Sequence, residues 1–127
     1  MTQEQKDLLL KDLCGRLQYG VKMNHVANIE NNTITLVGIA KTMITIESPA
    51  GYGTSDIEDY IPYLFHLSSM TEEQMDEYEN LRQDINDKLK DWKCANLLDW
   101  LNKNHFDYRC LIEKGLAIDA TGLNIYN

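Results

Sequence analysis

Apolar residues recur at helical spacing along the first twenty residues of the chain. Thr2 and Gln5 in "TQEQ" have the spacing of a capping box, in which each side chain bonds the other residue's backbone N–H. Gly20 follows the last periodic residue and is a typical helix stop. The pattern therefore predicts an N-terminal helix, whose single apolar face is formed by Leu9, Leu10, Leu13, Cys14 and Leu17.

From residue 21 the apolar period shortens to two. "VKMNHVANI" (21–29) alternates loosely, and "TITLVGI" (33–39) and "TMITIES" (42–48) alternate more strictly and are rich in β-branched residues. The asparagine-rich "ENNT" (30–33) is a turn signal. We therefore expect three antiparallel strands, the last one ended by a plain turn at "SPAGYG" (48–53), because its glycines permit positive φ and its proline cannot continue a ladder.

Residues 56–70, "DIEDYIPYLFHLSSM", have a mixed pattern. Ile57, Tyr60, Ile61 and Leu64 have helical spacing, but Pro62 interrupts it. Proline is disruptive beyond the first turn of a helix. We expect a short helical turn up to Tyr60, followed by an irregular apolar crossing.

Helical spacing returns in the last third of the chain. Thr71 and Gln74 predict a second capping box, and apolar residues then recur from Met75 to Trp92. The stripe slips over residues 92–95, which indicates a bend or break there, and a shorter helix follows; the pattern leaves open whether the two are continuous. Residues 107–115 predict a third short helix with Asp107 as its N-cap and Gly115 as its stop. "LAI" (116–118) could add an edge strand.

Together these elements predict an α+β fold. It would have an N-terminal helix, a small antiparallel sheet of three or four strands and a helical C-terminal half. The 127 residues are the length of one ordinary domain, so we expect a single domain over residues 1–127.

The net charge of −8 is concentrated in one part of the chain. No Lys or Arg occurs between Lys41 and Arg82. An acidic surface formed by this part of the chain would repel a phosphate backbone, so we expect no direct nucleic-acid binding. A basic partner is compatible with such a surface. The acidic residues of this middle block are Glu47, Asp56, Glu58, Asp59, Glu72, Glu73, Asp76, Glu77 and Glu79.

Membrane and export signals are not found in the sequence. No apolar run approaches the 18 residues of a membrane span, and "MTQEQKDLLLKDL" at the start does not have the pattern of a secretory signal. We therefore expect no membrane partner and a cytoplasmic location.

The densest set of reactive side chains is His105, Asp107, Tyr108, Arg109 and Cys110. A nucleophile needs a base within reach, but these positions do not share one helix face. Cys110 precedes Leu111 and Ile112 and is expected to be a small buried hydrophobe, as are the other thiols. Arg109 is expected to pair with Glu113 on a helix surface. We therefore expect no catalytic residue, and the protein is not expected to be an enzyme.

Metal and cofactor binding have no support in the spacing of the ligating residues. The three histidines are far apart, the three cysteines make no CxxC pair, and "DIEDY" does not have the spacing of a calcium loop. We expect neither a metal nor a cofactor.

Several segments together resemble a known family: "PYL", "LSSMTEE", "DWLNKNHFDYR" and "LIEKGLAI", within a likeness that begins at "LCGRLQYGVK" and covers most of the chain. The family is a widespread one of small proteins without an assigned activity, encoded in gut-bacterial genomes and in their phages or mobile elements. The resemblance implies this setting and no mechanism. The chain departs from the family pattern at Cys110, where the pattern has glycine, and at Phe65-His66, where it has Arg-Pro.

The charge pattern and the resemblance favour a small acidic binding protein of phage or mobile-element type that acts by protein–protein contact. Its partner could be a host defence protein or a nucleic-acid-handling protein. An alternative is a small-molecule or nucleotide sponge built on Arg16, Arg82 or Arg109, and an enzyme of unknown reaction is a third. The oligomeric state is left open by the sequence. The residues predicted to contact a protein partner are Tyr52, Asp56, Glu58, Asp59, Tyr60, Tyr63, Glu72 and Glu73.

Overall fold

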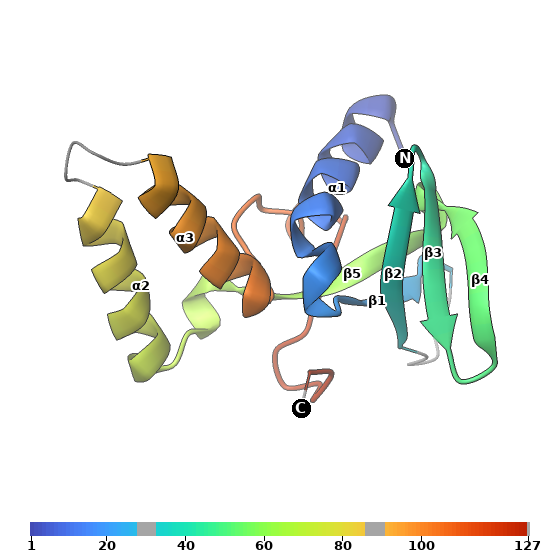
Figure 1. Ribbon diagram of the computed structural model, residues 1–127. Helices are drawn as coiled ribbons and strands as arrows, with labels where there is room; N and C mark the ends of the chain where they lie inside the picture. The colour runs from blue at the N-terminus through green and yellow to red at the C-terminus, as the bar shows by residue number, and fades with distance from the viewer. Residues whose placement is uncertain (28–32, 86–90, 127) are drawn as a thin grey trace.

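A computed structural model of the chain describes residues 1–27, 33–85 and 91–126. Helices, short 3-10 turns (η) and strands follow one another along the chain (Figure 1). They are α1 (Gln3–Arg16), η1 (Leu17–Tyr19), β1 (Lys22–His25), β2 (Ile34–Ala40), β3 (Met43–Ser48), β4 (Gly51–Asp56), η2 (Ile57–Asp59), β5 (Tyr60–His66), η3 (Leu67–Ser69), α2 (Glu72–Ile85), α3 (Asp91–Lys103), β6 (Phe106–Asp107) and β7 (Ile118–Asp119).

The described strands form one seven-stranded sheet. Its order is β4-β3-β2-β1-β5-β6, and β7 also pairs with β5. The strands from β1 to β5 pair antiparallel, whereas β6 and β7 run parallel to β5. β5 therefore receives three partners, two of which come from the last quarter of the sequence.

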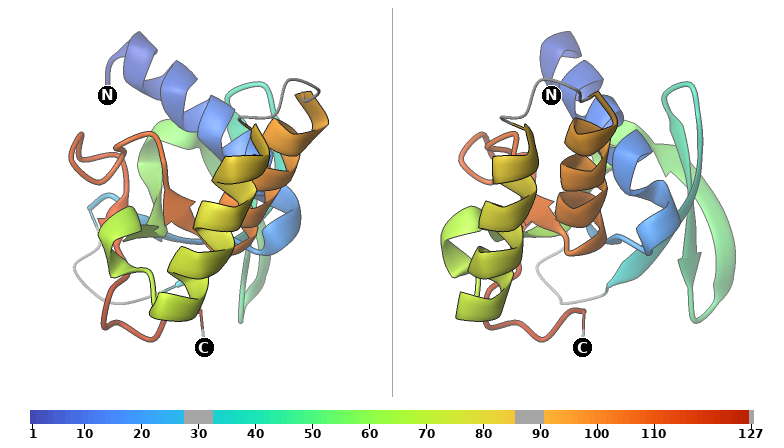
Figure 2. Two further views of the ribbon diagram at one scale, coloured as in Figure 1. Left: turned by 90° about the vertical axis from the view of Figure 1, so that its left-hand side faces the viewer. Right: turned by 60° about the vertical axis from the view of Figure 1, so that its left-hand side comes forward.

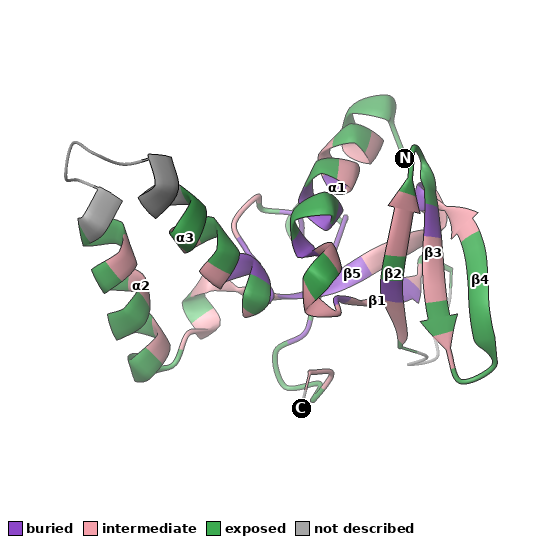
Figure 3. Cartoon of the chain, viewed as in Figure 1, coloured by how far each residue is buried: buried purple, intermediate pink, exposed green. Residues whose placement is uncertain are grey.

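The helices lie on one side of the β2–β4 part of the sheet. In Figures 1 and 2, α1 lies against one face of these strands, and no described element covers their other face. Helices α2 and α3 pack side by side at the opposite end of the molecule. The core fills the space between α1, the sheet and the segment after β6, as the purple residues in Figure 3 show. It contains Leu9, Leu13, Val21, Met23, Leu36, Ile44, Ile57, Leu64, Leu111, Leu116 and Ala117.

The two predicted capping boxes are confirmed. Thr2 and Gln5 exchange side-chain-to-backbone hydrogen bonds of 2.8 and 3.1 Å, and Thr71 and Gln74 do the same at 3.0 and 3.2 Å. Each box satisfies N–H groups that a helix start would otherwise leave unpaired. Gly20 adopts φ 66° at the end of η1, as expected of a stop residue.

The predicted small three- or four-stranded sheet with a helical C-terminal half is wrong. The sheet is larger, and β6 and β7 lie in the half that was expected to be helical. "SPAGYG" does not simply end a strand, since β4 starts at Gly51 and pairs with β3 along its whole length. The expected apolar crossing is strand β5, with Pro62 buried inside it opposite Met23.

Residues 107–115 form a turn and not the predicted helix. The Asp107 carboxylate accepts hydrogen bonds from the backbone N–H groups of Arg109, Leu111 and Ile112, at 3.0 to 3.3 Å. These three bonds satisfy backbone N–H groups of the turn, which therefore do not need the hydrogen bonds of a helix. Gly115 does reverse the chain, at φ 74°.

Two further expectations concern the helical region and the first hairpin. The break expected over residues 92–95 is wrong, because α3 runs through these positions. Whether α2 and α3 are continuous depends on residues 86–90, which lie outside the described residues, as does most of the "ENNT" turn. The possible strand at 116–118 overlaps the observed β7, Ile118–Asp119, only at Ile118.

Candidate functional site

The residues predicted to contact a partner lie at two opposite ends of the molecule. Tyr52 and Asp56 belong to β4 and the following residues to η2 and β5, whereas Glu72 and Glu73 lie in the first turn of α2. Figure 1 places β4 and α2 at the two far sides of the fold. The middle block is therefore continuous in sequence but does not form one surface.

Strand β4 is one edge of the sheet, and its first four residues are exposed. Tyr52 is the most exposed large hydrophobic residue described, at 75%. It lies opposite Glu47 in the β3–β4 register. Within residues 1–27, 33–85 and 91–126, β4 pairs with β3 alone, so its other side offers backbone N–H and C=O groups that belong to no ladder among these residues.

The acidic residues after β4 are held by local contacts. Asp56 caps η2 by accepting a hydrogen bond of 3.1 Å from the N–H of Glu58. Asp59 accepts a bond of 3.1 Å from the hydroxyl of Ser55, and Glu58 forms an ion pair of 3.0 Å with Lys6 of α1. This contact with Glu58 raises the pKa of the Lys6 ammonium.

The two tyrosines of β5 differ in exposure. Tyr60 is half-buried, and its ring meets His25 edge-on with 5.2 Å between centroids. Tyr63 is 1% exposed, and its hydroxyl accepts a hydrogen bond of 3.1 Å from Asn24. Tyr63 is therefore part of the interior and cannot contribute to a contact surface.

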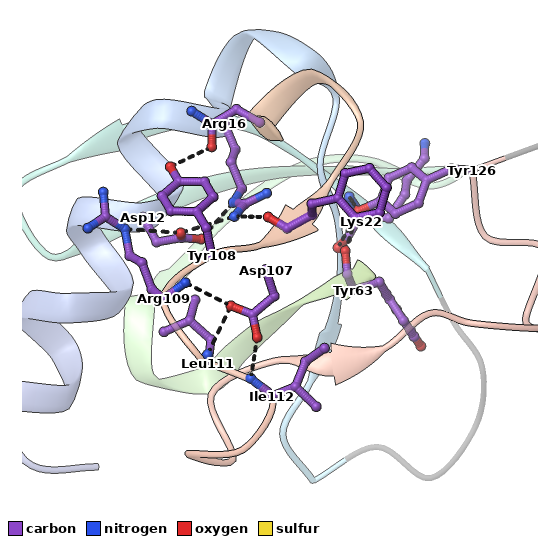
Figure 4. Close-up of polar contacts among 12 residues, drawn as sticks. Asp12, Arg16, Lys22, Tyr63, Asp107, Tyr108, Arg109, Leu111, Ile112 and Tyr126 are labelled. Carbon is purple, nitrogen blue, oxygen red and sulfur yellow. Dashed lines mark hydrogen bonds and ion pairs between the residues drawn. The ribbon is translucent and has the colours of Figure 1, made fainter. Parts of the chain in front are cut away.

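The polar segment 105–110 contributes to a buried ionic centre with α1 (Figure 4). Arg16 and Asp12 are both 0% exposed, one helical turn apart. Arg16 Nε donates to Asp12 at 2.7 Å, and Nη2 donates to Asp12 at 3.2 Å and to the Phe106 carbonyl at 2.6 Å. Arg109 Nε lies 3.3 Å from the same carboxylate, so Arg109 pairs with Asp12 and not with Glu113 as expected.

Tyr108 completes this centre. Its ring contacts the guanidinium groups of Arg16 and Arg109, each 5.0 Å from the ring centroid. Its hydroxyl donates to Asn102 Oδ1 at 2.7 Å. One carboxylate and one aromatic ring thus hold two cations, joining α1, α3 and the turn after β6. The arrangement is structural, because Asp12 and Arg16 are sealed from solvent.

Sequence reasoning missed Asp12 and Arg16 as interior residues. Asp12 lies three residues after Leu9 and Arg16 three residues after Leu13, so both lie beside the buried leucines of α1. They were missed because burial of ionised side chains is uncommon and because a spacing of four residues also describes an ordinary surface ion pair.

The three arginines considered for a nucleotide sponge do not converge. Arg16 is enclosed and Arg109 is paired with Asp12, whereas Arg82 lies on the exposed side of α2, 3.3 Å from Glu79. The surface hollow beside η3 is lined by none of the three. The geometry gives the sponge hypothesis no support.

His105 and Tyr126 form a second buried feature. Their rings stack with 3.6 Å between centroids and 10° between planes. Burial lowers the pKa of His105 to about 4, and the nearby cations Arg16 and Lys22 add to this effect. Burial also raises the pKa of Tyr126, whose hydroxyl donates to the Tyr63 carbonyl at 2.7 Å. His105 is thus a neutral core residue.

A surface hollow of about 270 Å³ lies between η3 and the Asp107 turn. Cys110 is exposed at its edge with φ 58°, which corrects the expectation of a buried thiol there. Cys14 on α1 is exposed as well. The hollow is lined by His66, Leu67, Ser68, Asp107, Cys110 and Glu113.

Metal clusters and membrane spans were sought in the described ranges. Among these residues, no group of three or more His, Cys, Asp or Glu side chains is placed to hold a metal ion. Within the same ranges, no helix has the length and apolar character needed to cross a membrane.

Comparisons with known protein families, with curated proteins and with solved structures gave no match for this chain.

Proposed function

We propose that this chain is a small protein-binding protein whose partner adds an extended segment along β4. The observation that carries the proposal is the free edge of the sheet. Among the described strands β4 pairs only with β3, and four of its six residues are exposed. An extended peptide that adds to such an edge gains main-chain hydrogen bonds from every second residue.

The composition of β4 favours such an addition. Native sheets often protect their edges with Lys, Pro or a covering element. β4, "GYGTSD", contains no lysine or proline, and Gly51 and Gly53 leave the backbone open to close approach. Tyr52 supplies a rigid aromatic ring with a polar tip, the kind of residue that often dominates binding energy at interfaces.

The charge near the edge favours a basic segment. Four carboxylates and two lysines lie near β4. One of the lysines, Lys6, already pairs with Glu58. An acidic rim would speed the approach of a basic partner and discriminate against acidic ones. The charged residues concerned are Glu47, Asp56, Glu58, Asp59, Lys6 and Lys41.

The family resemblance supplies the biological setting of the proposal. A chain of phage or mobile-element type would meet host proteins, and a host defence protein or a nucleic-acid-handling protein is the partner class we propose. Proteins that bind nucleic acid carry exposed basic segments, which fits the acidic rim of β4.

The test compares two double variants with matched changes. In the first, Glu47→Lys is combined with Tyr52→Ala at the β4 edge. In the second, Glu73→Lys is combined with Met75→Ala on α2, where Met75 is also exposed. Each reverses one acid and truncates one exposed hydrophobic side chain. The affinity of a partner isolated from host lysate should fall at least about tenfold for the first variant only.

A proline scan tests the mode of binding. Successive residues of a strand direct their N–H groups to opposite sides. Of Gly53→Pro and Thr54→Pro, one therefore removes a bond to β3 and lowers stability, and the other removes an outward donor and lowers binding alone. Equal binding by wild type and all β4 variants, or an equal loss in the α2 variant, would refute the proposal.

A further inference from the structure

The hollow beside η3 brings a thiol and an imidazole together. Cys110 and His66 line it from different parts of the chain, the first from the turn after β6 and the second from the end of β5. β5 and β6 pair in parallel with His66 opposite Asp107, so the turn that carries Cys110 starts directly beside the histidine. The juxtaposition comes from the tertiary fold and is not visible in the sequence spacing.

An acid lies behind the imidazole. His66 Nε2 is 3.9 Å from Asp119 Oδ2, and β7 carries Asp119 to this position by pairing beside Leu64. Nε2 of His66 thus faces Asp119, and Nδ1 is the ring nitrogen left to accept a proton from the thiol. Thiol, imidazole and carboxylate are the three groups by which a cysteine nucleophile is activated and its base oriented.

Cys110 is also accessible. Its side chain is exposed, and its backbone is in the left-handed region at φ 58°, a conformation that residues other than glycine seldom adopt. The Asp107 carboxylate fixes this turn through its three backbone hydrogen bonds. The sulfur is therefore held at the rim of the hollow.

The geometry points to Cys110 as a reactive thiol that forms mixed disulfides with small cationic disulfides, with His66 as its base. The thiol proton passes to His66, and the thiolate attacks one sulfur of the disulfide. The sulfur–sulfur bond of the reagent breaks as the new bond to Cys110 forms. The leaving thiolate takes up the proton, so the disulfide is the oxidant and no further reactant is needed.

The preference for a cationic disulfide follows from the walls of the hollow. Glu113 is exposed at its rim, and Asp119 lies behind His66. Asp107 also lines the hollow, and its carboxylate accepts three backbone hydrogen bonds. An anionic reagent such as glutathione disulfide would be repelled, whereas cystamine, which carries two ammonium groups, would be attracted.

The chain supplies its own control. Cys14 is also exposed, but it lies within helix α1 and does not line the hollow. Trypsin would release the three cysteines in different peptides, DLCGR, CANLLDWLNK and CLIEK. Each site can therefore be followed by mass spectrometry in the wild-type protein, without removing any cysteine.

The experiment measures mixed-disulfide formation with cystamine and with glutathione disulfide at pH 7. We expect Cys110 to react with cystamine about tenfold faster than Cys14 does. His66→Gln should lower the Cys110 rate several-fold and leave the Cys14 rate unchanged. Glu113→Gln should reduce the preference of Cys110 for cystamine over glutathione disulfide.

Two results would overturn the inference. Equal rates at Cys110 and Cys14 would show that the hollow does not activate the thiol. An unchanged Cys110 rate in His66→Gln, in a variant with a wild-type melting curve, would show that His66 is not the base. The side chain of His66 is 38% exposed, so the variant should fold. The outcome does not depend on whether β4 binds a partner.

Discussion

The imidazole of His105 stacks on the ring of Tyr126, with 3.6 Å between centroids, and so joins the loop after α3 to the last residues of the chain. The Tyr126 hydroxyl extends this link by donating to the Tyr63 carbonyl and accepting a 2.9 Å bond from the Lys22 N–H. Strands β1 and β5 are thus held by a residue more than sixty positions away in sequence.

The histidine of this pair should make stability depend on pH. Its pKa is lowered to about 4 in the folded state, so the folded protein binds fewer protons than the unfolded chain, in which the histidine has its ordinary pKa of about 6.5. Stability from this group is complete above pH 6.5 and is lost as the pH falls toward 4. We expect a loss on the order of 2 kcal/mol.

Urea unfolding of wild type and His105→Asn between pH 7 and pH 4 measures this effect. Asparagine tolerates the positive φ of 61° that His105 adopts. The variant should be less stable at pH 7, but the difference from wild type should shrink as the pH falls. A difference in stability that stays constant with pH would contradict the lowered pKa of His105.

Removal of the Tyr126 hydroxyl should destabilise the fold. Tyr126→Phe leaves the Lys22 N–H and the Tyr63 carbonyl without this partner, and we expect a loss of roughly 1–2 kcal/mol in the free energy of unfolding. Tyr52→Phe is the control, since Tyr52 is 75% exposed, and it should have no measurable effect. Similar losses of stability in both variants would argue against a stabilising role of the two Tyr126 hydrogen bonds.

Breaking the buried ionic centre should have the largest effect. Asp12→Asn removes the carboxylate that Arg16 and Arg109 share, and it leaves a buried guanidinium without its counter-ion. We expect a loss of roughly 3–5 kcal/mol. Glu79→Gln, which removes the exposed partner of Arg82, should cost less than about 0.5 kcal/mol. Chemical denaturation of both variants measures these two losses in the free energy of unfolding.

Cys14 and Cys110, the cysteines that the structure describes as exposed, should respond differently to replacement by glycine. Cys110→Gly relieves a positive φ and should keep or raise stability by up to about 1 kcal/mol. Cys14→Gly places glycine inside α1 and should lower stability by about 1 kcal/mol. Thermal unfolding of both variants measures the contrast, and equal losses would show that the Cys110 turn is unstrained.

Local signals in the sequence predicted two helix starts, one stop and two strands correctly. The capping boxes at Thr2 and Thr71 and the stop at Gly20 depend on residues three to four positions apart, and all three form. Strands β2 and β3 likewise follow from alternation within seven residues. Such features need no information about the rest of the fold.

Several of the features that were predicted wrongly or missed depend on distant residues, although the turn after Asp107 is closed by local hydrogen bonds. Pro62 argued against a strand, but β5 forms because β1, β6 and β7 all pair with it. β4 contains two glycines and reads as a turn, yet β3 supplies a partner for each of its residues. In the same way, Arg16 is buried because it contacts Phe106 and Tyr108, which lie about ninety residues later in the sequence.

The predicted contact surface was divided for the same reason. The absence of Lys and Arg between Lys41 and Arg82 can be read from the sequence. The path of β5, which places the two halves of the acidic block at opposite ends of the fold, cannot. The hollow with Cys110 and His66 was equally invisible, since 44 positions separate the two residues and only the parallel β5–β6 pairing brings them together.

The parallel partners of β5 also determine the order in which the molecule can assemble. The hairpins β2–β3 and β3–β4 close loops of a few residues, so they can form early at a small cost in chain entropy. β6 and β7 reach β5 only after about forty or fifty further residues have been traversed. The slow step of folding should therefore be the docking of residues 106–119 onto β5, and until then its second half stays open to other extended chains.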